Sequence, residues 1–157
     1  FIYCNEMWNQ LDALTGLLNQ NSYLNRTREV RRDGGVLIVF DVDDFKMIND
    51  RYGHVQGDAC LSAIAACIKK AYANYGECYR IGGDEFCVLL KKMEMEAECR
   101  QNFDRYLEKK RRNITFLPTV SVGSSVFSGE DILKIKDRAD RDMYQCKKER
   151  KDCAGAE

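Results

Sequence analysis

The 157-residue sequence has little proline, little histidine and no net charge. One proline and 11 glycines give no low-complexity or disordered composition, and 45% hydrophobic residues are ample for the core of one domain. The 25 basic side chains balance the 25 acidic ones, which removes the usual electrostatic reason to expect nucleic acid or an anionic membrane as a partner. No apolar run approaches the roughly 20 residues of a membrane-spanning helix. We therefore expect one domain without membrane contact, in which any anion site is local.

The eight cysteines are dispersed along the chain and form no CxxC pair. Since only His54 could add an imidazole, a zinc site of ordinary spacing is not expected. Cys60 and Cys67 lie in an apolar helical pattern and Cys87 in a hydrophobic run, so we predict small buried residues and not a disulfide framework. This usage is typical of a reducing cytoplasm.

The chain begins with Phe1-Ile2-Tyr3-Cys4 and lacks the basic, apolar and small-residue zones of a signal peptide. We therefore expect a piece of a longer protein. Residues 1–11 carry apolar side chains at helical spacing, which predicts the end of a helix arriving from upstream. A frayed terminus is the alternative.

Hydrophobic periodicity predicts that strands and helices alternate after this segment. The run Val36 to Phe40 has no polar alternation, which is typical of a strand covered on both faces. Ser128 and Asp131 resemble a capping box at the start of the last helix. Strands are expected at 36–40, 77–81, 86–90 and 119–127, and helices at 22–32, 55–73, 94–112 and from 132 onward. Such a chain predicts an α/β sandwich with helices packed on a central sheet.

Two acidic points fall at strand ends. Asp41 and Asp43 follow the first strand, and Asp84 with Glu85 forms the tip of the predicted hairpin. If these strands are neighbours, the carboxylates converge on one hard cation, and Mg²⁺ suits such oxygen ligands and takes the rest of its shell from phosphates. The glycines before Asp84 could approach a bulky ligand closely and take a positive φ. The alternative is a solvated hairpin tip.

The segment after the first strand offers further polar groups. Asp44-Phe45-Lys46 opens a helix, where free backbone N–H groups and a cation could meet a phosphate. Asn49 and Asp58 suit the donor edge of guanine. The structural alternative is that these side chains, or Asp43 and Asp44, cap helices.

Two lysines near the end of the chain have the spacing of one helix face. Lys147 and Lys151 are four residues apart and could hold the oxygens of a triphosphate. A solvated basic end of a helix is the alternative.

Several ordered blocks together resemble the GGDEF family of diguanylate cyclases. They extend from Asp12 to Lys151, which is 140 of 157 residues. The blocks are Asp12-Ala13-Leu14-Thr15-Gly16-Leu17, Phe40-Asp41-Val42-Asp43-Asp44-Phe45-Lys46-Met47-Ile48-Asn49-Asp50, Gly53-His54 with Gly57-Asp58, Arg80-Ile81-Gly82-Gly83-Asp84-Glu85-Phe86, Ser121-Val122-Gly123, and Ala139-Asp140 through Met143-Tyr144 to Lys147. The resemblance implies that residues 12–157 form one GGDEF domain, with a central, mostly antiparallel sheet flanked by helices in a nucleotidyl-cyclase-like, ferredoxin-like sandwich. Residues 1–11 would end an upstream connecting helix.

The resemblance also implies a reaction and partners. Two GTP molecules, one on each of two facing copies of the domain, condense into cyclic di-GMP and two pyrophosphates by Mg²⁺-assisted phosphoryl transfer, with Mn²⁺ as the alternative ion. The domain would be the output module of a longer signalling protein with an upstream sensor, in the cytoplasm or on the cytoplasmic side of a membrane. A catalytically silent GTP-binding module is the alternative function.

Individual roles follow from the resemblance alone. Asp41, Asp84 and the carbonyl of Val42 would bind the metal, and Glu85 would assist metal binding or deprotonate the attacking 3′-hydroxyl. Asp41, Asp84 and Glu85 are therefore the expected catalytic set. The expected substrate-binding residues are Asp44, Phe45, Lys46, Asn49, Asp58, Gly82, Gly83, Lys147 and Lys151.

Two segments depart from the family pattern. Ala73 and Gly76 stand where many members have the Arg and Asp of a product-inhibition motif, so we expect this inhibitory site to be absent. Arg150-Lys151-Asp152 replaces the usual Gly-Arg-Asn, which keeps a positive charge at Lys151 and alters the turn chemistry.

Overall fold

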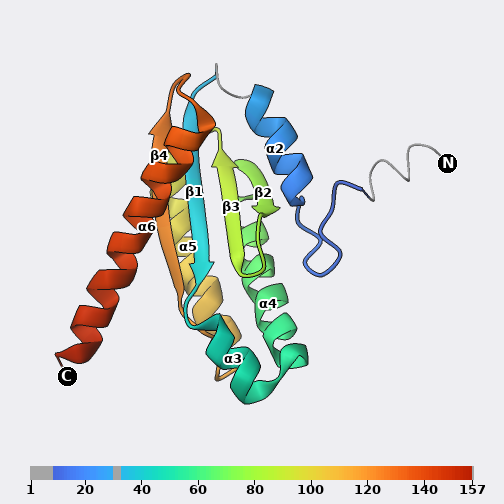
Figure 1. Cartoon of the computed structure of the whole chain (residues 1–157), viewed down its shortest axis with the longest axis vertical. Coiled ribbons are helices and arrows are strands. Elements are labelled where there is room, and N and C mark those ends of the chain that lie inside the picture. Colours follow the sequence, from blue (N-terminus) through green and yellow to red (C-terminus); the bar gives the residue numbers. More distant parts are fainter. Residues whose placement is uncertain (1–8, 30–32, 157) are drawn as a thin grey trace.

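The computed structural model describes residues 9–29 and 33–156. Its centre is an antiparallel sheet with the strand order β2-β3-β1-β4 (Figure 1). The strands are β1 (Gly35–Val42), β2 (Gly76–Arg80), β3 (Glu85–Leu90) and β4 (Val120–Phe127). The predicted strands and the hairpin are thus confirmed, and β1 lies in the interior of the sheet.

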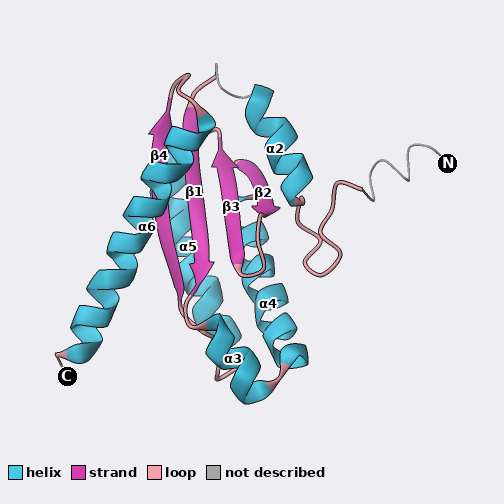
Figure 2. Cartoon of the chain, in the orientation of Figure 1, coloured by secondary structure: helices cyan, strands magenta, loops and turns pink. Residues whose placement is uncertain are grey.

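Helices cover both faces of this sheet (Figure 2). They are α2 (Gln20–Glu29), α3 (Phe45–Tyr52), α4 (His54–Tyr72), α5 (Glu96–Arg111, after the short 3-10 helix η2, Met93–Met95) and α6 (Ile132–Gly155). Helices α4 and α5 pack on one face, and α2 and α6 pack on the other. The expected flanked antiparallel sheet is confirmed. Within the described ranges, no helix combines the length and apolar character that crossing a bilayer requires.

Alternation along β1 divides the core into two layers. Ile38 and Phe40 pack with α4 and α5, whereas Leu37 and Val39 pack with α6. Successive side chains of a strand point to opposite faces, so a strand buried on both sides has an unbroken apolar sequence. The same alternation places Asp41, the next residue of the Leu37 and Val39 series, on the α6 face.

Helix α6 lies unusually close to β4 at a glycine. A Cβ at Gly123 would stand 2.2 Å from the backbone nitrogen of Met143 and 2.3 Å from the carbonyl oxygen of Ala139. Only a residue without a side chain therefore permits this packing. The contact fixes the part of α6 that carries Lys147.

Helix ends account for the differences from the sequence prediction. Helix α6 is capped by Asp131, whose Oδ1 accepts the N–H of Leu133 at 3.1 Å, so the proposed cap at Ser128 was wrong. Helix α2 begins at Gln20, two residues earlier than predicted, and Asn19 Oδ1 accepts the N–H of Ser22 at 3.0 Å. The predicted incoming helix lies outside the described residues over 1–8, and its last residue, Leu11, instead forms a bridge with Leu18.

The cysteines behave as core residues. Cys60, Cys67 and Cys87 are free and buried, as the sequence predicts, and Cys78 and Cys99 are buried as well. Burial raises the pKa of the Cys67 thiol, which keeps it protonated and unreactive.

Candidate active site

The two acidic points meet at one end of the sheet. Asp41 of β1 and Glu85 of β3 are direct cross-strand partners, and the N–H of Val42 donates to the carbonyl oxygen of Asp84 at 3.1 Å. The condition that the sequence left open, that the two strands are neighbours, is therefore met. The three residues expected to be catalytic therefore lie together, Asp41 and Glu85 as a cross-strand pair and Asp84 hydrogen-bonded to the end of β1.

Each carboxylate of the Asp41–Glu85 pair contacts a lysine from α6. Lys147 Nζ lies 3.1 Å from Asp41 Oδ2, and Lys136 Nζ lies 2.8 Å from Glu85 Oε1. Burial opposes the charged form of both lysines, but the hydrogen bonds and charges of their carboxylate partners outweigh it and raise the pKa of each. Both side chains are therefore cationic at neutral pH.

Asp41 is partly buried and lies close to two other carboxylates. Burial raises the pKa of the Asp41 carboxyl, and the nearby Asp84 and Asp43 carboxylates add to this effect, while the hydrogen bond from Lys147 opposes it. A divalent cation would stabilise the charged form of this carboxyl. Among the described residues, no three Asp, Glu, His or Cys side chains already surround a common point. The donor set of carboxylate and backbone oxygens nevertheless fits a hard ion such as Mg²⁺.

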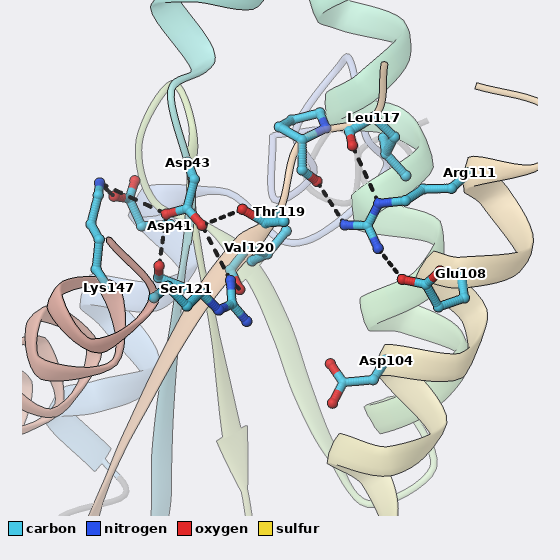
Figure 3. Close-up of polar contacts among 12 residues, drawn as sticks. Asp41, Asp43, Asp104, Glu108, Arg111, Leu117, Thr119, Val120, Ser121 and Lys147 are labelled. Atoms are coloured by element: carbon cyan, nitrogen blue, oxygen red, sulfur yellow. Dashed lines mark hydrogen bonds and ion pairs between the residues drawn. The ribbon is translucent and has the colours of Figure 1, made fainter. Parts of the chain in front are cut away.

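Asp43 has a structural role that the sequence did not reveal. Its side chain is only 12% exposed, and its two oxygens accept hydrogen bonds from the hydroxyls of Thr119 and Ser121, each at 2.7 Å (Figure 3). Arg150 of α6 lies 3.2 Å away and also donates to the carbonyl of Val120 at 2.8 Å. Asp43 thus ties β1, β4 and α6 together beside Asp41.

The alternative that Asp43 or Asp44 caps α3 is confirmed only for the position of Asp44, because no side chain caps the helix. Asp44 occupies the N-cap position, but it has a left-handed backbone with φ 52° and its side chain makes no cap hydrogen bond. Asp43 is directed to β4 instead.

The expected phosphate-binding residues partly converge. A cavity of about 110 Å³ is lined by Asp43, Asp44, Thr119, Lys147, Arg150, Lys151 and Ala154. Lys147, Arg150 and Lys151 bring three cations to it from one helix, and Asp44 brings the start of α3. This arrangement can hold an anion next to the carboxylates, because the three cations line the same space, beside Asp44 at the N-cap of α3. Lys46 and Phe45 follow Asp44 in α3 but do not line the cavity.

Asn49 and Asp58 come from adjacent helices. A Cβ at Gly57 of α4 would stand 1.9 Å from Asn49 Oδ1, so the absence of a side chain there makes room for the Asn49 amide. Oδ1 of Asn49 is buried and has no hydrogen-bond partner among the described residues. A buried acceptor in a purely structural role is normally paired, so this unpaired oxygen is a candidate contact for a ligand. Asp58 follows Gly57 and is exposed.

The hairpin tip is clamped by an arginine. Arg80 donates to the carbonyl oxygens of Gly82 at 3.2 Å and Gly83 at 2.7 Å, and to the Asp12 carboxylate at 3.2 Å. Neither glycine has a positive φ, contrary to the sequence expectation. Nothing lies within 4 Å of a Cβ built at Gly83, so the tip faces open space where a ligand could approach.

Sequence reasoning missed three residues of this site: Lys136, Arg150 and Arg80. Arg80 belongs to the segment Arg80-Ile81-Gly82-Gly83-Asp84-Glu85-Phe86 and Arg150 to the basic end of the last helix, but the sequence pattern indicates no role for either side chain. Lys136 carried only the weak signal of a pair with Asp140 four residues later, which also occurs on ordinary exposed helices.

Comparisons with known proteins agree on one family. Residues 9–153 match the family model described as "Diguanylate cyclase, GGDEF domain". The chain is 35% identical to diguanylate cyclase DgcP of Pseudomonas aeruginosa, over 90% of this chain and 23% of that protein. It is 31% identical to diguanylate cyclase DgcZ of Escherichia coli, over 93% of this chain and 53% of that protein. The chain therefore spans between about a quarter and a half of these curated relatives.

Solved structures show the same fold. Diguanylate cyclase SiaD of Pseudomonas aeruginosa, solved in complex with its activator SiaC, superposes with a TM-score of 0.79 at 29% identity, covering 94% of this chain and 62% of that chain. The GGDEF domain of DgcB from Caulobacter crescentus, solved in complex with c-di-GMP, gives a TM-score of 0.76 at 25% identity, covering 88% and 90%.

Proposed function

We propose a catalytic function for this chain, which belongs to the GGDEF domain family of diguanylate cyclases. In this proposal, it condenses two GTP molecules into cyclic di-GMP and two pyrophosphates. The observation that carries this proposal is the pairing of Asp41 with Glu85 across β1 and β3, beside Asp84. All three acidic residues keep the carboxylates that metal-assisted phosphoryl transfer requires.

The acidic cluster would hold Mg²⁺, or Mn²⁺ in its place. Asp41, Asp84 and the carbonyl of Val42 are the proposed ligands, with Glu85 as a further ligand or as the group that accepts the proton of the attacking 3′-hydroxyl. The ion, when bound, supplies positive charge to the phosphate oxygens as the bond to pyrophosphate breaks. The sheet holds the backbone of these carboxylates in place, so the carboxylates are already arranged for the ion before the reaction begins.

Cations and helix ends would position the nucleotide. Lys147 and Lys151, together with the backbone of Asp44, Phe45 and Lys46, are proposed to hold the phosphates. Asn49 and Asp58 are proposed to recognise the guanine edge, whose N–H groups are donors that amide and carboxylate oxygens accept. Gly82 and Gly83 would leave room for the ligand beside the hairpin.

A second copy of the domain completes the reaction in this proposal. The residues above can bind one GTP, while the product joins two, so two domains must face each other. Specific activity should therefore rise with protein concentration until the dimer is fully formed. Because the relatives are longer than this chain, we also propose that it is the output domain of a larger cytoplasmic signalling protein with an upstream sensor.

The decisive experiment is to incubate the purified domain at high concentration with Mg²⁺ and either GTP or ATP, and to identify products by mass. Asp84→Ala and Glu85→Ala are the test variants. Glu98→Ala is the matched control, because Glu98 is exposed on α5, on the opposite face of the sheet. Cyclic di-GMP formed from GTP, lost in the two test variants and kept in the control, is the expected result.

Two other outcomes would decide against the cyclase. Mg²⁺-dependent GTP binding by calorimetry, without turnover at any protein concentration, would support the silent GTP-binding module instead. Absence of GTP binding would refute a nucleotide site of either kind.

A further inference from the structure

Lys136 makes three hydrogen bonds to carboxylates beside the acidic cluster. Its ammonium lies 2.8 Å from Glu85 Oε1 and 2.9 and 2.8 Å from the two oxygens of Asp140. The side chain is 23% exposed, so these contacts are partly shielded from water. Three charge-assisted hydrogen bonds hold one ammonium between a carboxylate of the sheet and a carboxylate of its own helix.

The position of Lys136 follows from the packing of α6. Lys136, Asp140, Met143 and Lys147 are spaced by four, three and four residues, which places them on one face of the helix. That face is held against β4 by the close backbone contact at Gly123. The distance from Lys136 to Glu85 is therefore fixed by backbone packing as well as by charge.

The contact restrains one oxygen of Glu85 and leaves the other available. Oε1 accepts the hydrogen bond from Lys136, whereas Oε2 accepts none from the residues of 9–29 and 33–156. Glu85 is 33% exposed, and its carboxylate would be free to rotate without this partner. With Oε1 held by Lys136, the rotation of the Glu85 carboxylate is restricted, and Oε2 lies beside the hairpin tip, 3.6 Å from a Cβ built at Gly82.

We propose that Lys136, itself oriented by Asp140, is a positioning residue that fixes the Glu85 carboxylate for its role in the reaction. This inference rests on the proposed cyclase function and assigns a residue to it. Partners that hydrogen-bond a functional carboxylate from outside typically contribute about 10- to 100-fold to activity or metal affinity. Lys136 does not line the cavity proposed for the phosphates, so its effect should fall on the chemical step and not on GTP binding.

The test compares Lys136→Met with Lys134→Met, a matched change at an exposed lysine two residues away on α6. Lys136→Met should lower kcat by about 10- to 100-fold with KM for GTP changed less than about threefold, and Lys134→Met should change neither. Lys136→Arg keeps a cation of similar reach and should recover most of the loss. Asp140→Asn weakens the hold on Lys136 without touching Glu85 and should give a smaller loss of kcat.

A second readout does not depend on activity. In domain carrying ¹³C-labelled glutamate, the Glu85 carboxyl resonance, assigned with Glu85→Gln, should shift in Lys136→Met and remain in place in Lys134→Met. If Lys136→Met does not fold, Asp140→Asn provides both readouts.

The possible failures are distinguishable. An active wild type with unchanged kcat in Lys136→Met, or an unchanged Glu85 resonance, would overturn the positioning role while the cyclase stands. An equal loss in Lys136→Arg and Lys136→Met would also overturn it. An inactive wild type would overturn the proposed function, and the positioning role with it.

Discussion

Replacing Gly123 with alanine tests whether close packing of α6 sets the geometry of the site. The added Cβ would stand 2.2 Å from the backbone nitrogen of Met143, about 1.2 Å short of the 3.4 Å at which ordinary contact begins. Both obstructing atoms belong to the backbone of α6, so no side-chain rotation relieves the overlap. The helix must move away from β4.

The magnitude follows from this displacement. Overpacking of a core typically costs about 1 to 3 kcal/mol, and the gain from replacing a strand glycine is below about 1 kcal/mol, so Gly123→Ala should be destabilising. For a chain of this size, the overpacking cost alone corresponds to a fall in Tm of roughly 2 to 12 °C, from which the smaller gain at the glycine is subtracted. A shift of about 1 Å would also carry Lys136 and Lys147 out of hydrogen-bond reach of Glu85 and Asp41, and misplacement of that size can cost about 100-fold in rate.

Thermal unfolding and cyclic di-GMP formation measure the two effects in the same preparation. Gly155→Ala is the matched control, because nothing lies within 4 Å of a Cβ at Gly155 near the end of the same helix. We expect the control to keep the Tm and activity of the wild type. If Gly123→Ala kept both within about 1 °C and threefold, the argument that backbone packing of α6 positions the lysines would be refuted.

Three further substitutions test other parts of the site. Gly57→Ala should raise the Kd for GTP, measured by calorimetry, by about tenfold or more, because the added Cβ displaces the Asn49 amide. An unchanged Kd would count against that amide as a guanine contact. Asp43→Ala should lower the free energy of unfolding by about 1 to 3 kcal/mol in urea, since it leaves two hydroxyls and an arginine without their acceptor, and an unshifted midpoint would contradict this. Hydrogen bonds from Thr15 and from Arg80 outweigh burial and lower the pKa of Asp12. Asp12→Asn should therefore lower the free energy of unfolding by about 1 kcal/mol. The full difference from the wild type should be seen above the unfolded-state pKa of 3.8, and it should shrink as the pH falls toward the lower folded-state pKa. A difference that is independent of pH would disprove this origin.

The sequence is most informative where a pattern is local. The apolar run of β1 predicts a strand buried on both faces, because five consecutive buried side chains, Val36 to Phe40, must point alternately to the two faces of the sheet. The hairpin follows from two such runs around a glycine pair. Helix ends are less predictable. Asp131 and Ser128 have similar intrinsic N-cap preferences, and only the backbone turn before α6 decides which of them caps the helix.

Contacts between distant segments could not be read from the chain. Strand order decides that Asp41 faces Glu85, and the alternating pattern of the strands does not specify that order. Asp41 and Asp43 are chemically alike and lie on the same face, so the sequence could not tell which of them Thr119 and Ser121 engage. Lys136 lies 51 residues from Glu85, and its role depends wholly on how α6 crosses the sheet.

The location of the carboxylates at a strand end has a consequence for both the fold and the site. A one-residue slip of β1 against β3 would turn Asp41 toward α4 and α5, into the layer that Ile38 and Phe40 occupy in the native register, and would turn those two side chains toward α6. There the carboxylate would lose Lys147 and be buried without a partner, which costs several kcal/mol. The native register is therefore selected by the apolar layer on one side and by the lysines of α6 on the other. The same pairing that discriminates against the wrong register brings Asp41 and Glu85 together, so the geometry proposed for catalysis is fixed during folding and needs no separate ordering step when substrate binds.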